Sequence, residues 1–241
     1  MRIVSCVPSI SELVASFDAS QLVGRTRFCT EPAQIGGVAV IGGTKNLNVD
    51  AIRSLKPDVI LAVKEENSKD QIEKLMEDFR VIVFEIGTME DAIQMIIDVG
   101  SLMQKENLAM DLCRLIRDRF ENLVFQVKIP VLYLIWENPV MTIGADTFIH
   151  HMLSKAGFQN VFEDQNRYPV VDLERDLPGE PEIIILSSEP YPFRQKHLDR
   201  FRERFPHATV VLADGSLFSW YGSRMAQFPD YVLKFREQCG F

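Results

Sequence analysis

In the segment Lys56-Pro57-Asp58-Val59-Ile60-Leu61-Ala62-Val63, five consecutive apolar residues follow a proline turn. A short apolar run of this kind, bounded by a turn, is typical of a strand that is buried on both faces. Such strands belong to parallel sheets whose faces are covered by helices. The sequence therefore predicts a parallel α/β sheet with a central strand at residues 59–63.

Strand and helix signals alternate on both sides of this run. Ser9 or Ser11 is expected to cap the first helix, and Gly42-Gly43-Thr44 is expected to form a turn. Alternation of this kind predicts a first α/β lobe over residues 1–88. Its further strands are expected at residues 3–7, 22–24, 38–41 and 81–84, and its helices at 12–17, 49–55 and 69–79.

Residues 89–128 show helical spacing without a strand signal. They predict two consecutive helices that break near residues 105–107. The second helix, of about 20 residues, would be about 30 Å long at its usual rise per residue. We expect this segment to be a long, rigid connection between two lobes.

The second lobe is expected over residues 129–241, because the signals alternate again there. The segment Glu180-Pro181-Glu182-Ile183-Ile184-Ile185-Leu186 repeats the pattern of the first stretch and suggests an internal duplication. Asp146-Thr147 is typical of a helix N-cap. Strands are expected at residues 131–136, 161–162, 182–186 and 209–213, and helices at 147–156, 194–205 and 225–238. The predicted fold is α/β with two parallel-sheet lobes.

The composition narrows the class of partner. The chain has 241 residues, 46% of them hydrophobic, and a formal net charge of -8. An acidic chain is a poor match for nucleic acid or an anionic membrane surface, and no apolar stretch is long enough to cross a bilayer. We expect a monomer that binds a small molecule. Met1 and Arg2 lead directly into a strand, which predicts a cytoplasmic location, or a periplasmic one if a leader has been removed.

The four cysteines are scattered without a metal-binding spacing, so reduced thiols are expected, with a Cys6–Cys29 disulfide as the alternative. His150 and His151 are neighbours on a predicted helix and point about 100° apart, which is unsuitable for a shared metal ion. His197 and His207 are expected on the surface. We therefore predict no metal site and no cofactor other than a bound ligand.

Ligands of open parallel sheets bind beyond the carboxyl ends of the strands. Both tryptophans of the chain follow predicted strands, and aromatic side chains supply large, stiff contact surfaces. Arg27 and Arg224, like Lys64 and Glu189, lie on different predicted lobes and could clamp a polar ligand. The alternative is that the aromatics pack under their own lobe and the charges are merely solvated. The candidate ligand-binding residues are Ser9, Arg27, Phe28, Lys64, Glu65, Asn67, Trp136, Tyr168, Glu189, Tyr191, Trp220, Tyr221 and Arg224.

The sequence lacks the glycine-rich dinucleotide fingerprint, the phosphate loop and the nucleophile elbow of common α/β enzymes. We therefore expect no catalytic residues. Two alternatives stay open. One is a cytosolic enzyme that uses Glu65, Glu189 or Asp214 as acid or base. The other is a protein that docks a partner chain through Phe218-Ser219-Trp220-Tyr221.

Several segments together resemble the class III substrate-binding proteins of ABC transporters, which bind vitamin B12, haem or ferric siderophores. The segments are Arg2-Ile3-Val4-Ser5-Cys6-Val7-Pro8-Ser9-Ile10-Ser11-Glu12-Leu13, Val23-Gly24-Arg25-Thr26, Val40-Ile41-Gly42-Gly43, Leu55-Lys56-Pro57-Asp58-Val59-Ile60 and Gly157-Phe158-Gln159-Asn160-Val161-Phe162. They occur in the family's order, and the set is most similar to the cobalamin-binding branch. The resemblance implies two Rossmann-like lobes joined by one long helix. It also implies a metal chelate held between the lobes and delivered to an ABC permease.

The resemblance is weaker at the positions that would contact a permease. Secreted relatives carry a surface acid on each lobe for docking. The matching positions here are Lys69 or Asp70 in the first lobe and Gly222-Ser223 in the second. This departure leaves open a cytosolic relative that binds a corrinoid without serving a permease.

Overall fold

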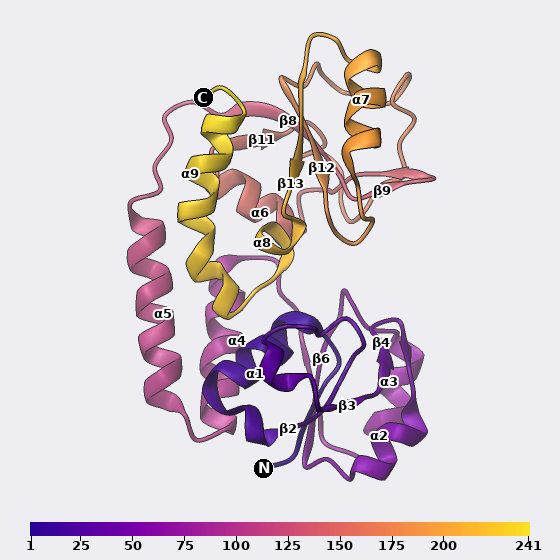
Figure 1. Cartoon of the computed structure of the whole chain (residues 1–241), viewed down its shortest axis with the longest axis vertical. Coiled ribbons are helices and arrows are strands. Elements are labelled where there is room, and N and C mark those ends of the chain that lie inside the picture. The colour runs from indigo at the N-terminus through magenta and orange to yellow at the C-terminus, as the bar shows by residue number, and fades with distance from the viewer. The chain divides into compact units, whose positions relative to one another are not determined.

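The computed structural model describes residues 1–241 and consists of two compact units. The two are built from interleaved parts of the chain. The first unit contains Met1–Ile86, Glu90–Leu115 and Trp220–Met225, and the second contains Gly87–Met89, Ile116–Ser219 and Ala226–Phe241. Each unit is described below by itself (Figure 1).

The first unit is built on a five-stranded parallel sheet with the strand order β3-β2-β1-β6-β7. Every residue of β6 is buried, as its uninterrupted apolar sequence predicts. The parallel sheet expected from the sequence is thus confirmed. Its strands are β1 (Ile3–Ser5), β2 (Leu22–Arg25), β3 (Ala39–Val40), β6 (Val59–Val63) and β7 (Val81–Phe84).

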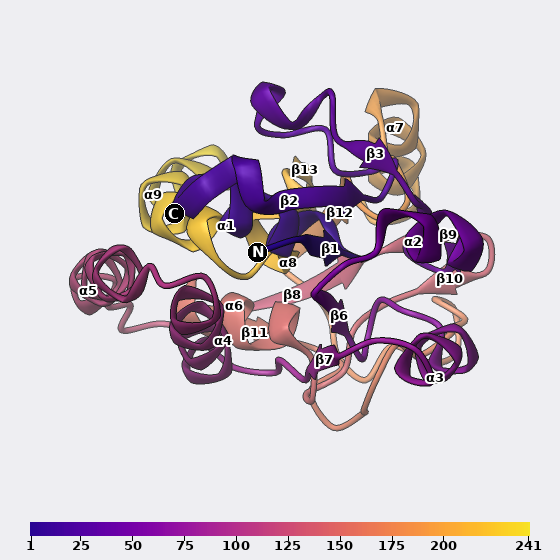
Figure 2. The same ribbon diagram turned by 90° about the horizontal axis from the view of Figure 1, so that it is seen from below.

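Helices cover both faces of this sheet. Figure 2 shows α1 on one face and α2 with α3 on the other. A cluster of buried apolar side chains, including Ile52 of α2 and Ile72 of α3, fills the space against Val4 and Ile60 of the sheet. The helices are α1 (Pro8–Asp18), α2 (Val49–Leu55) and α3 (Lys69–Met76), with short 3-10 turns at Ala19–Gln21 and Ala33–Ile35.

The first helix begins earlier than expected. Pro8 occupies its first turn, where the missing backbone N–H costs nothing, and Val7 precedes it without a side-chain cap. The expected serine cap is therefore wrong. Ser11 lies inside the helix, where its hydroxyl donates to the carbonyl of Val7 at 3.0 Å. Ser9 is buried, and its Oγ has no hydrogen-bond partner.

The expected turn at residues 42–44 belongs to a small antiparallel hairpin, β4 (Gly42–Gly43) with β5 (Asn46–Leu47). Gly42 has a φ of 104°, a conformation that side chains with a Cβ rarely adopt. A Cβ on this residue would also lie 2.4 Å from the carbonyl oxygen of Asn46. The hairpin therefore depends on glycine at position 42.

Two antiparallel helices follow the first sheet, α4 (Met89–Leu102) and α5 (Glu106–Glu121). Within the first unit they touch closely, because a Cβ on Gly100 would lie 2.3 Å from the Cβ of Ala109. Helix α5 has 16 residues, or about 24 Å, and is shorter than the 20 residues expected. Its residues up to Leu115 belong to the first unit and the rest to the second. The rigidity of this connection stays a prediction.

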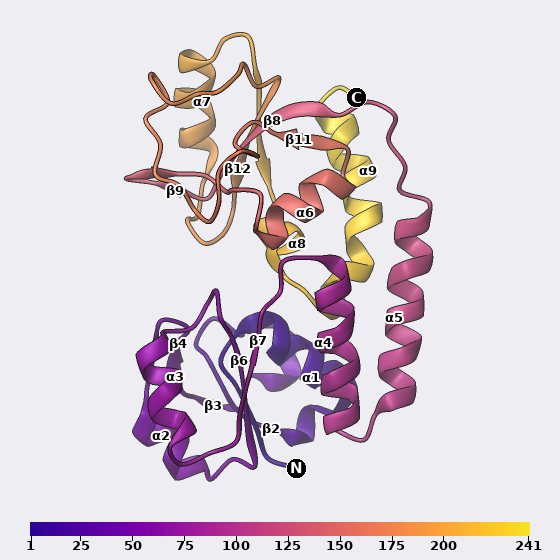
Figure 3. The same cartoon turned by 180° about the vertical axis from the view of Figure 1, so that it is seen from behind.

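The second unit has a four-stranded parallel sheet with the order β11-β8-β12-β13. Figure 3 shows α6 and α9 on one face and α7 on the other. Phe120 of α5 stacks on Phe228 of α9 with ring centroids 5.5 Å apart. The strands are β8 (Ile129–Leu134), β11 (Phe158–Asn160), β12 (Ile183–Ser187) and β13 (Thr209–Ala213). The helices are α6 (Phe148–Lys155), α7 (Gln195–Arg204) and α9 (Phe228–Gln238).

Several expectations for this unit need correction. The strand expected at residues 161–162 is β11 at Phe158–Asn160, directly after Gly157. Residues 135–141 contain a second hairpin, β9 (Trp136–Glu137) with β10 (Val140–Met141). The segment after β13, where no helix was expected before residue 225, contains a short helix α8 (Gly215–Ser219) and a 3-10 turn at Ser223–Gln227. Thr147 does cap α6, since its Oγ1 accepts the N–H of His150 at 3.2 Å.

Candidate ligand-binding faces

The carboxyl edge of the first sheet is held together by Asn67. Its side-chain Oδ1 accepts the N–H of Val63 at 2.8 Å, and its Nδ2 donates to the carbonyls of Cys6 and Thr44 at 3.1 and 3.0 Å. These bonds tie the ends of β1 and β6 to the turn of the β4–β5 hairpin. The sequence placed Asn67 among the ligand-binding residues, but the structure uses its buried amide to fix the loops.

Lys64 and Glu65, which follow β6, have neighbours of their own. The Nζ of Lys64 lies 2.6 Å from an oxygen of Glu85, and both side chains are largely exposed. An exposed pair of this kind contributes only about 0–1 kcal/mol and can be exchanged for a ligand. The backbone carbonyl of Glu65 accepts from Lys45 Nζ at 2.7 Å.

The segment Trp220–Met225 packs onto the first unit although it lies near the end of the chain. The hydroxyl of Tyr221 donates to Glu66 at 2.6 Å. Arg224 pairs with Glu12 of α1, with its Nε 3.1 Å from Oε2, and its guanidinium lies 4.1 Å from the ring centre of Trp220. Glu12 and Glu66 were not predicted.

These contacts change the interpretation of the segment. Because Arg224 and Glu12 are mostly buried, their ion pair is screened less than a surface pair. The charge of Arg224 is already neutralised by Glu12, which makes it a weak candidate for clamping an anionic ligand. Ser223 adds a hydrogen bond of 2.9 Å to the same carboxylate. The segment is therefore attached to α1 by several polar contacts.

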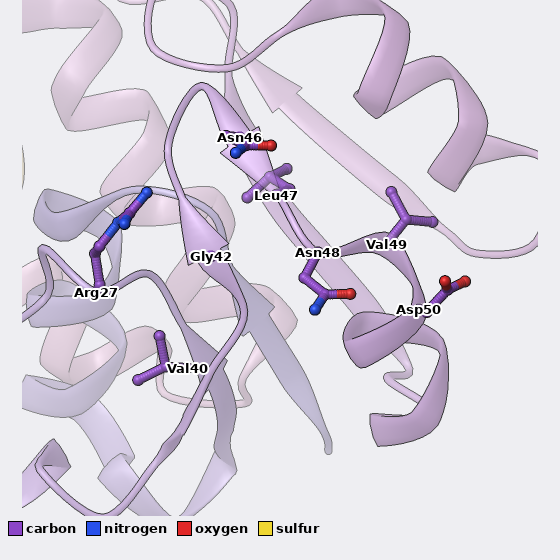
Figure 4. Close-up of a pocket in the computed structure, with 8 residues that line it drawn as sticks. All are labelled: Arg27, Val40, Gly42, Asn46, Leu47, Asn48, Val49 and Asp50. Atoms are coloured by element: carbon purple, nitrogen blue, oxygen red, sulfur yellow. The ribbon is translucent and has the colours of Figure 1, made fainter.

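Arg27 stands apart from the other cations of this edge. Its guanidinium makes no hydrogen bond or ion pair, and it lies 5.4 Å from the ring centre of the exposed Phe28. It rests against Gly43, where a Cβ would come within 2.9 Å of its Nη2. Figure 4 shows Arg27 lining a pocket of about 550 Å³ next to the β4–β5 hairpin.

The second unit presents an aromatic pair at the ends of β8 and β12. Trp136 is 39% exposed, and its ring meets that of Tyr191 edge-on, with centroids 5.5 Å apart and planes at 64°. The indole N–H donates to the carbonyl of Asn138 at 3.1 Å, which fixes the ring plane. Trp136 is thus held by the second unit while a large part of its surface stays accessible.

Glu137 holds Tyr191, one member of this pair, in place by a hydrogen bond. We did not name Glu137 as a candidate from the sequence. Its carboxylate accepts the hydroxyl of Tyr191 and forms an ion pair with Arg200. His197 Nε2 lies 3.3 Å from the same carboxylate. His197 Nδ1 accepts the backbone N–H of Arg194 at 2.7 Å, so Nε2 is the nitrogen that carries a proton. The expectation that His197 lies on the surface is wrong.

The electrostatics of this group follow from its geometry. Burial raises the pKa of Glu137, but the hydrogen bonds from Tyr191 and Arg200 and the positive charge of Arg200 outweigh it, and the pKa falls below its usual value. The hydrogen bond to Glu137 raises the pKa of Tyr191. Glu137 is therefore a carboxylate, and Tyr191 a neutral phenol, near neutral pH.

The remaining candidates of the second unit lie at the same edge. Glu189 is half-buried, and its backbone carbonyl accepts the hydroxyl of Ser187 at 2.5 Å. Tyr168 is half-buried in the long connection between β11 and β12. Asp214, an acid or base candidate, accepts the N–H and the hydroxyl of Ser216 at 3.0 and 2.7 Å. Its carboxylate thereby caps α8.

The four cysteines are free and buried, and the alternative Cys6–Cys29 disulfide is not formed. Burial raises the pKa of Cys6 to about 12, so its thiol is unreactive near neutral pH. Among all 241 residues, no three or more His, Cys, Asp or Glu side chains are grouped to hold a metal ion. No helix combines the length and apolar character needed to cross a bilayer.

Two parallel α/β units, each with aromatic and charged side chains at the carboxyl edge of its sheet, define a two-lobed binding protein. The family model described as "Periplasmic binding protein" matches residues 3–208, and the chain therefore belongs to this family. The family consists of solute-binding proteins, not enzymes, so the enzyme alternative with Glu65, Glu189 or Asp214 is not supported.

Individual relatives agree with this assignment. The vitamin B12-binding proteins of Vibrio parahaemolyticus and Photorhabdus laumondii are 22% and 26% identical to this chain, over 77% and 78% of it and 70% of each relative. The crystal structure of the periplasmic vitamin B12-binding protein of Vibrio cholerae matches with a TM-score of 0.84 and 19% identity, covering 99% of this chain and 97% of the other. A periplasmic haem-binding protein from Pseudomonas aeruginosa gives 0.84 and 18%, covering 99% and 93%.

Proposed function

We propose that this chain binds a bulky, cofactor-like metal chelate, with a corrinoid such as cobalamin as the first candidate. Haem and ferric siderophores are the other candidates. Membership of the periplasmic binding protein family and the vitamin B12-binding relatives support this proposal. The aromatic pair of Trp136 and Tyr191 carries it, because a fixed, partly exposed indole offers a flat apolar surface to a macrocycle.

The test uses the two tryptophans of the chain. In a Trp220→Phe background, Trp136 is the single indole reporter. We expect cyanocobalamin or haemin to quench its fluorescence in a saturable way. Free N-acetyltryptophanamide corrects for light absorbed by the ligand. The absence of saturable quenching by cobalamin, haemin and ferric siderophores at up to ~100 μM would contradict the proposal, because a dedicated binding protein binds far more tightly.

A second measurement assigns binding to the aromatic pair. By isothermal titration, Trp136→Ala should weaken chelate binding about tenfold or more, as expected when a large aromatic anchor is truncated. Leu233→Ala removes an exposed apolar side chain of α9 and serves as the matched control. Equal affinity of both variants and the wild type would exclude Trp136 from the site.

We infer that this chain serves an ABC permease in the periplasm and works as a monomer. The family supports the setting, since its members are periplasmic solute-binding proteins. Osmotic shock of the native host should release the protein with the periplasmic fraction, and light scattering should give the mass of one chain. Stimulation of a permease's ATPase by the loaded protein, but not by the empty one, would establish the partner. A cytoplasmic fraction without such stimulation would favour a corrinoid binder that serves no permease.

A further inference from the structure

The pocket beside the β4–β5 hairpin lies within the first unit, and four of its lining residues have polar or charged side chains. Its volume is about 550 Å³. The polar side chains come from three elements: Arg27 from the loop after β2, Asn46 from the hairpin, and Asn48 and Asp50 from the start of α2 (Figure 4). These residues could recognise a polar group of a ligand, and their hydrogen bonds indicate which kind.

The donors of this wall are available. Arg27 has no hydrogen bond or ion pair, and the side chain of Asn46 has none either. Asn48 caps α2 with its Oδ1, which accepts the N–H of Ala51 at 3.0 Å. Because this bond fixes which end of the amide is oxygen, the Nδ2 of Asn48 is left with two unused N–H groups.

The one acid of the wall is Asp50, whose side chain is 93% exposed. It lies 3.5 Å from Nη1 of Arg53, which also forms a closer pair with Asp78 at 2.7 Å. Because solvent and salt screen so exposed a carboxylate, the free guanidinium and free amide N–H groups are the dominant features of the pocket wall. In a chain with a formal net charge of -8, this is a local environment that favours an anion.

From this arrangement we propose that the pocket binds an anionic oxygen group of the ligand, a carboxylate carried by the chelate, with Arg27 as the specificity-determining residue. The inference rests on the proposed function and deepens it. An arginine fork binds a carboxylate through two parallel hydrogen bonds, which a neutral amide or ester cannot match. Gly43 acts as a positioning residue, because only a hydrogen in place of its Cβ lets the guanidinium of Arg27 lie where it does.

The experiment compares pairs of ligands whose main difference is the charge of a carboxyl group. One pair is haemin and its dimethyl ester, and the other is cyanocobalamin and a derivative with one amide hydrolysed to a carboxylate. In the wild type, the acid should bind about tenfold tighter than the neutral partner, as expected for a charge-assisted hydrogen bond. In Arg27→Gln this preference should vanish, because the affinity for the acid should fall about tenfold more than the affinity for the neutral ligand. Gly43→Ala should reduce the preference, because Arg27 must move away.

The control is Lys74→Gln, which removes one exposed positive charge of α3 outside the pocket. It should keep the full preference for the acid, so that a general charge effect is separated from a local one. An unchanged preference in Arg27→Gln, or an equal loss in Lys74→Gln, overturns the proposal.

A direct measurement separates this inference from the proposed function. Inorganic phosphate and acetate are titrated without chelate, and the side-chain amide signals of Asn46 and Asn48 are followed by NMR. Shifts in the wild type that disappear in Arg27→Gln support the anion pocket even if no chelate binds, in which case only the proposed function fails. Chelate binding without an acid preference and without such shifts overturns the pocket alone. Arg27-dependent shifts with equal binding of acid and neutral chelates overturn the assignment to a chelate carboxylate.

Discussion

At the scale of single residues, Asn67 illustrates a polar side chain whose role is architectural. Its amide makes three hydrogen bonds to backbone groups of three separate segments, and it is buried. Each such bond contributes about 0.5–1.5 kcal/mol, and each unpaired partner left behind adds a cost. The sequence placed Asn67 at the correct edge of the sheet, but only the folded structure shows that both of its N–H groups and its oxygen bind backbone groups.

Asn67→Ala should therefore lower the free energy of unfolding by about 2–4 kcal/mol, measured by urea denaturation. Asn46→Ala is the matched control, because the same side chain is exposed there and makes no hydrogen bond. Its effect should stay within about 0.5 kcal/mol. A similar loss in both variants would mean that the three hydrogen bonds of Asn67 contribute little.

Glu137 gives a prediction that depends on pH. Its pKa in the folded protein lies below the ordinary value of 4.5 because Tyr191 and Arg200 bind the carboxylate. Because the pKa is lowered by folding, the charged carboxylate contributes its full stabilisation at pH values above the ordinary pKa of 4.5. This contribution is lost as the pH falls through the folded-state pKa. The stability gap between the wild type and Glu137→Gln should be largest near neutral pH and shrink below about pH 4.5.

Urea midpoints of both proteins, measured from about pH 3 to pH 7, test this prediction across the range where carboxylates titrate. Glu203→Gln is the control on the neighbouring helix α7, where the glutamate is exposed. Its stability should differ little from the wild type at any pH. A gap for Glu137→Gln that stays constant across the range would show that the carboxylate gains nothing from its charged partners.

At the scale of elements, long apolar segments were predictable and very short ones were not. Strands β6 and β13 have the bounds that the sequence predicts, because an apolar run between turn residues leaves few alternatives. The hairpins β4–β5 and β9–β10 have strands of two residues, too short to show any periodicity. The candidate site follows the same rule. Strand ends can be located from the sequence, so residues that follow them can be named as candidates, and their role in binding stays a prediction. The contacts of Glu12, Glu66 and Glu137 could not be predicted, because tertiary packing brings these side chains to their partners.

The pair α4 and α5 depends on a close approach that one residue permits. A Cβ added to Gly100 would lie 2.3 Å from that of Ala109, far inside contact distance. Gly100→Ala gains helix propensity of up to about 1 kcal/mol, but overpacking a buried contact costs about 1–3 kcal/mol, and we expect the second effect to win. The variant should therefore be less stable than the wild type.

A double-mutant cycle checks this explanation. Ala109→Gly alone should destabilise the protein through lost helix propensity and packing. The double variant has a single Cβ at this contact, as the wild type does. Its loss of stability should therefore be smaller than the sum of the two single losses by at least about 1 kcal/mol. If the two single losses simply add in the double variant, the side chains at positions 100 and 109 do not clash, and the explanation is wrong.

At the scale of the whole molecule, the order of the chain makes each unit depend on the other. The first unit includes Trp220–Met225, and the chain on both sides of that segment belongs to the second unit. Helix α5 is likewise divided between them. Neither unit is therefore one continuous piece of chain, unlike the separate lobes at residues 1–88 and 129–241 that the sequence predicts. The lobe boundaries expected from the sequence stay a prediction.

This interleaving predicts that both units unfold together. Trp220 belongs to the first unit and Trp136 to the second, so Trp136→Phe and Trp220→Phe each leave one reporter in one unit. Glu12 holds the segment Trp220–Met225 in the first unit through Arg224 and Ser223. Because this segment is continuous with the second unit, unfolding of the second unit should pull it away from the first. Urea midpoints followed by the two reporters should coincide, as in a two-state transition.

In Glu12→Gln, which weakens the attachment of the segment, the midpoints should separate, with Trp220 reporting the earlier loss. Separate midpoints with Glu12 intact would mean that the segment is only loosely attached and that each unit is stable by itself.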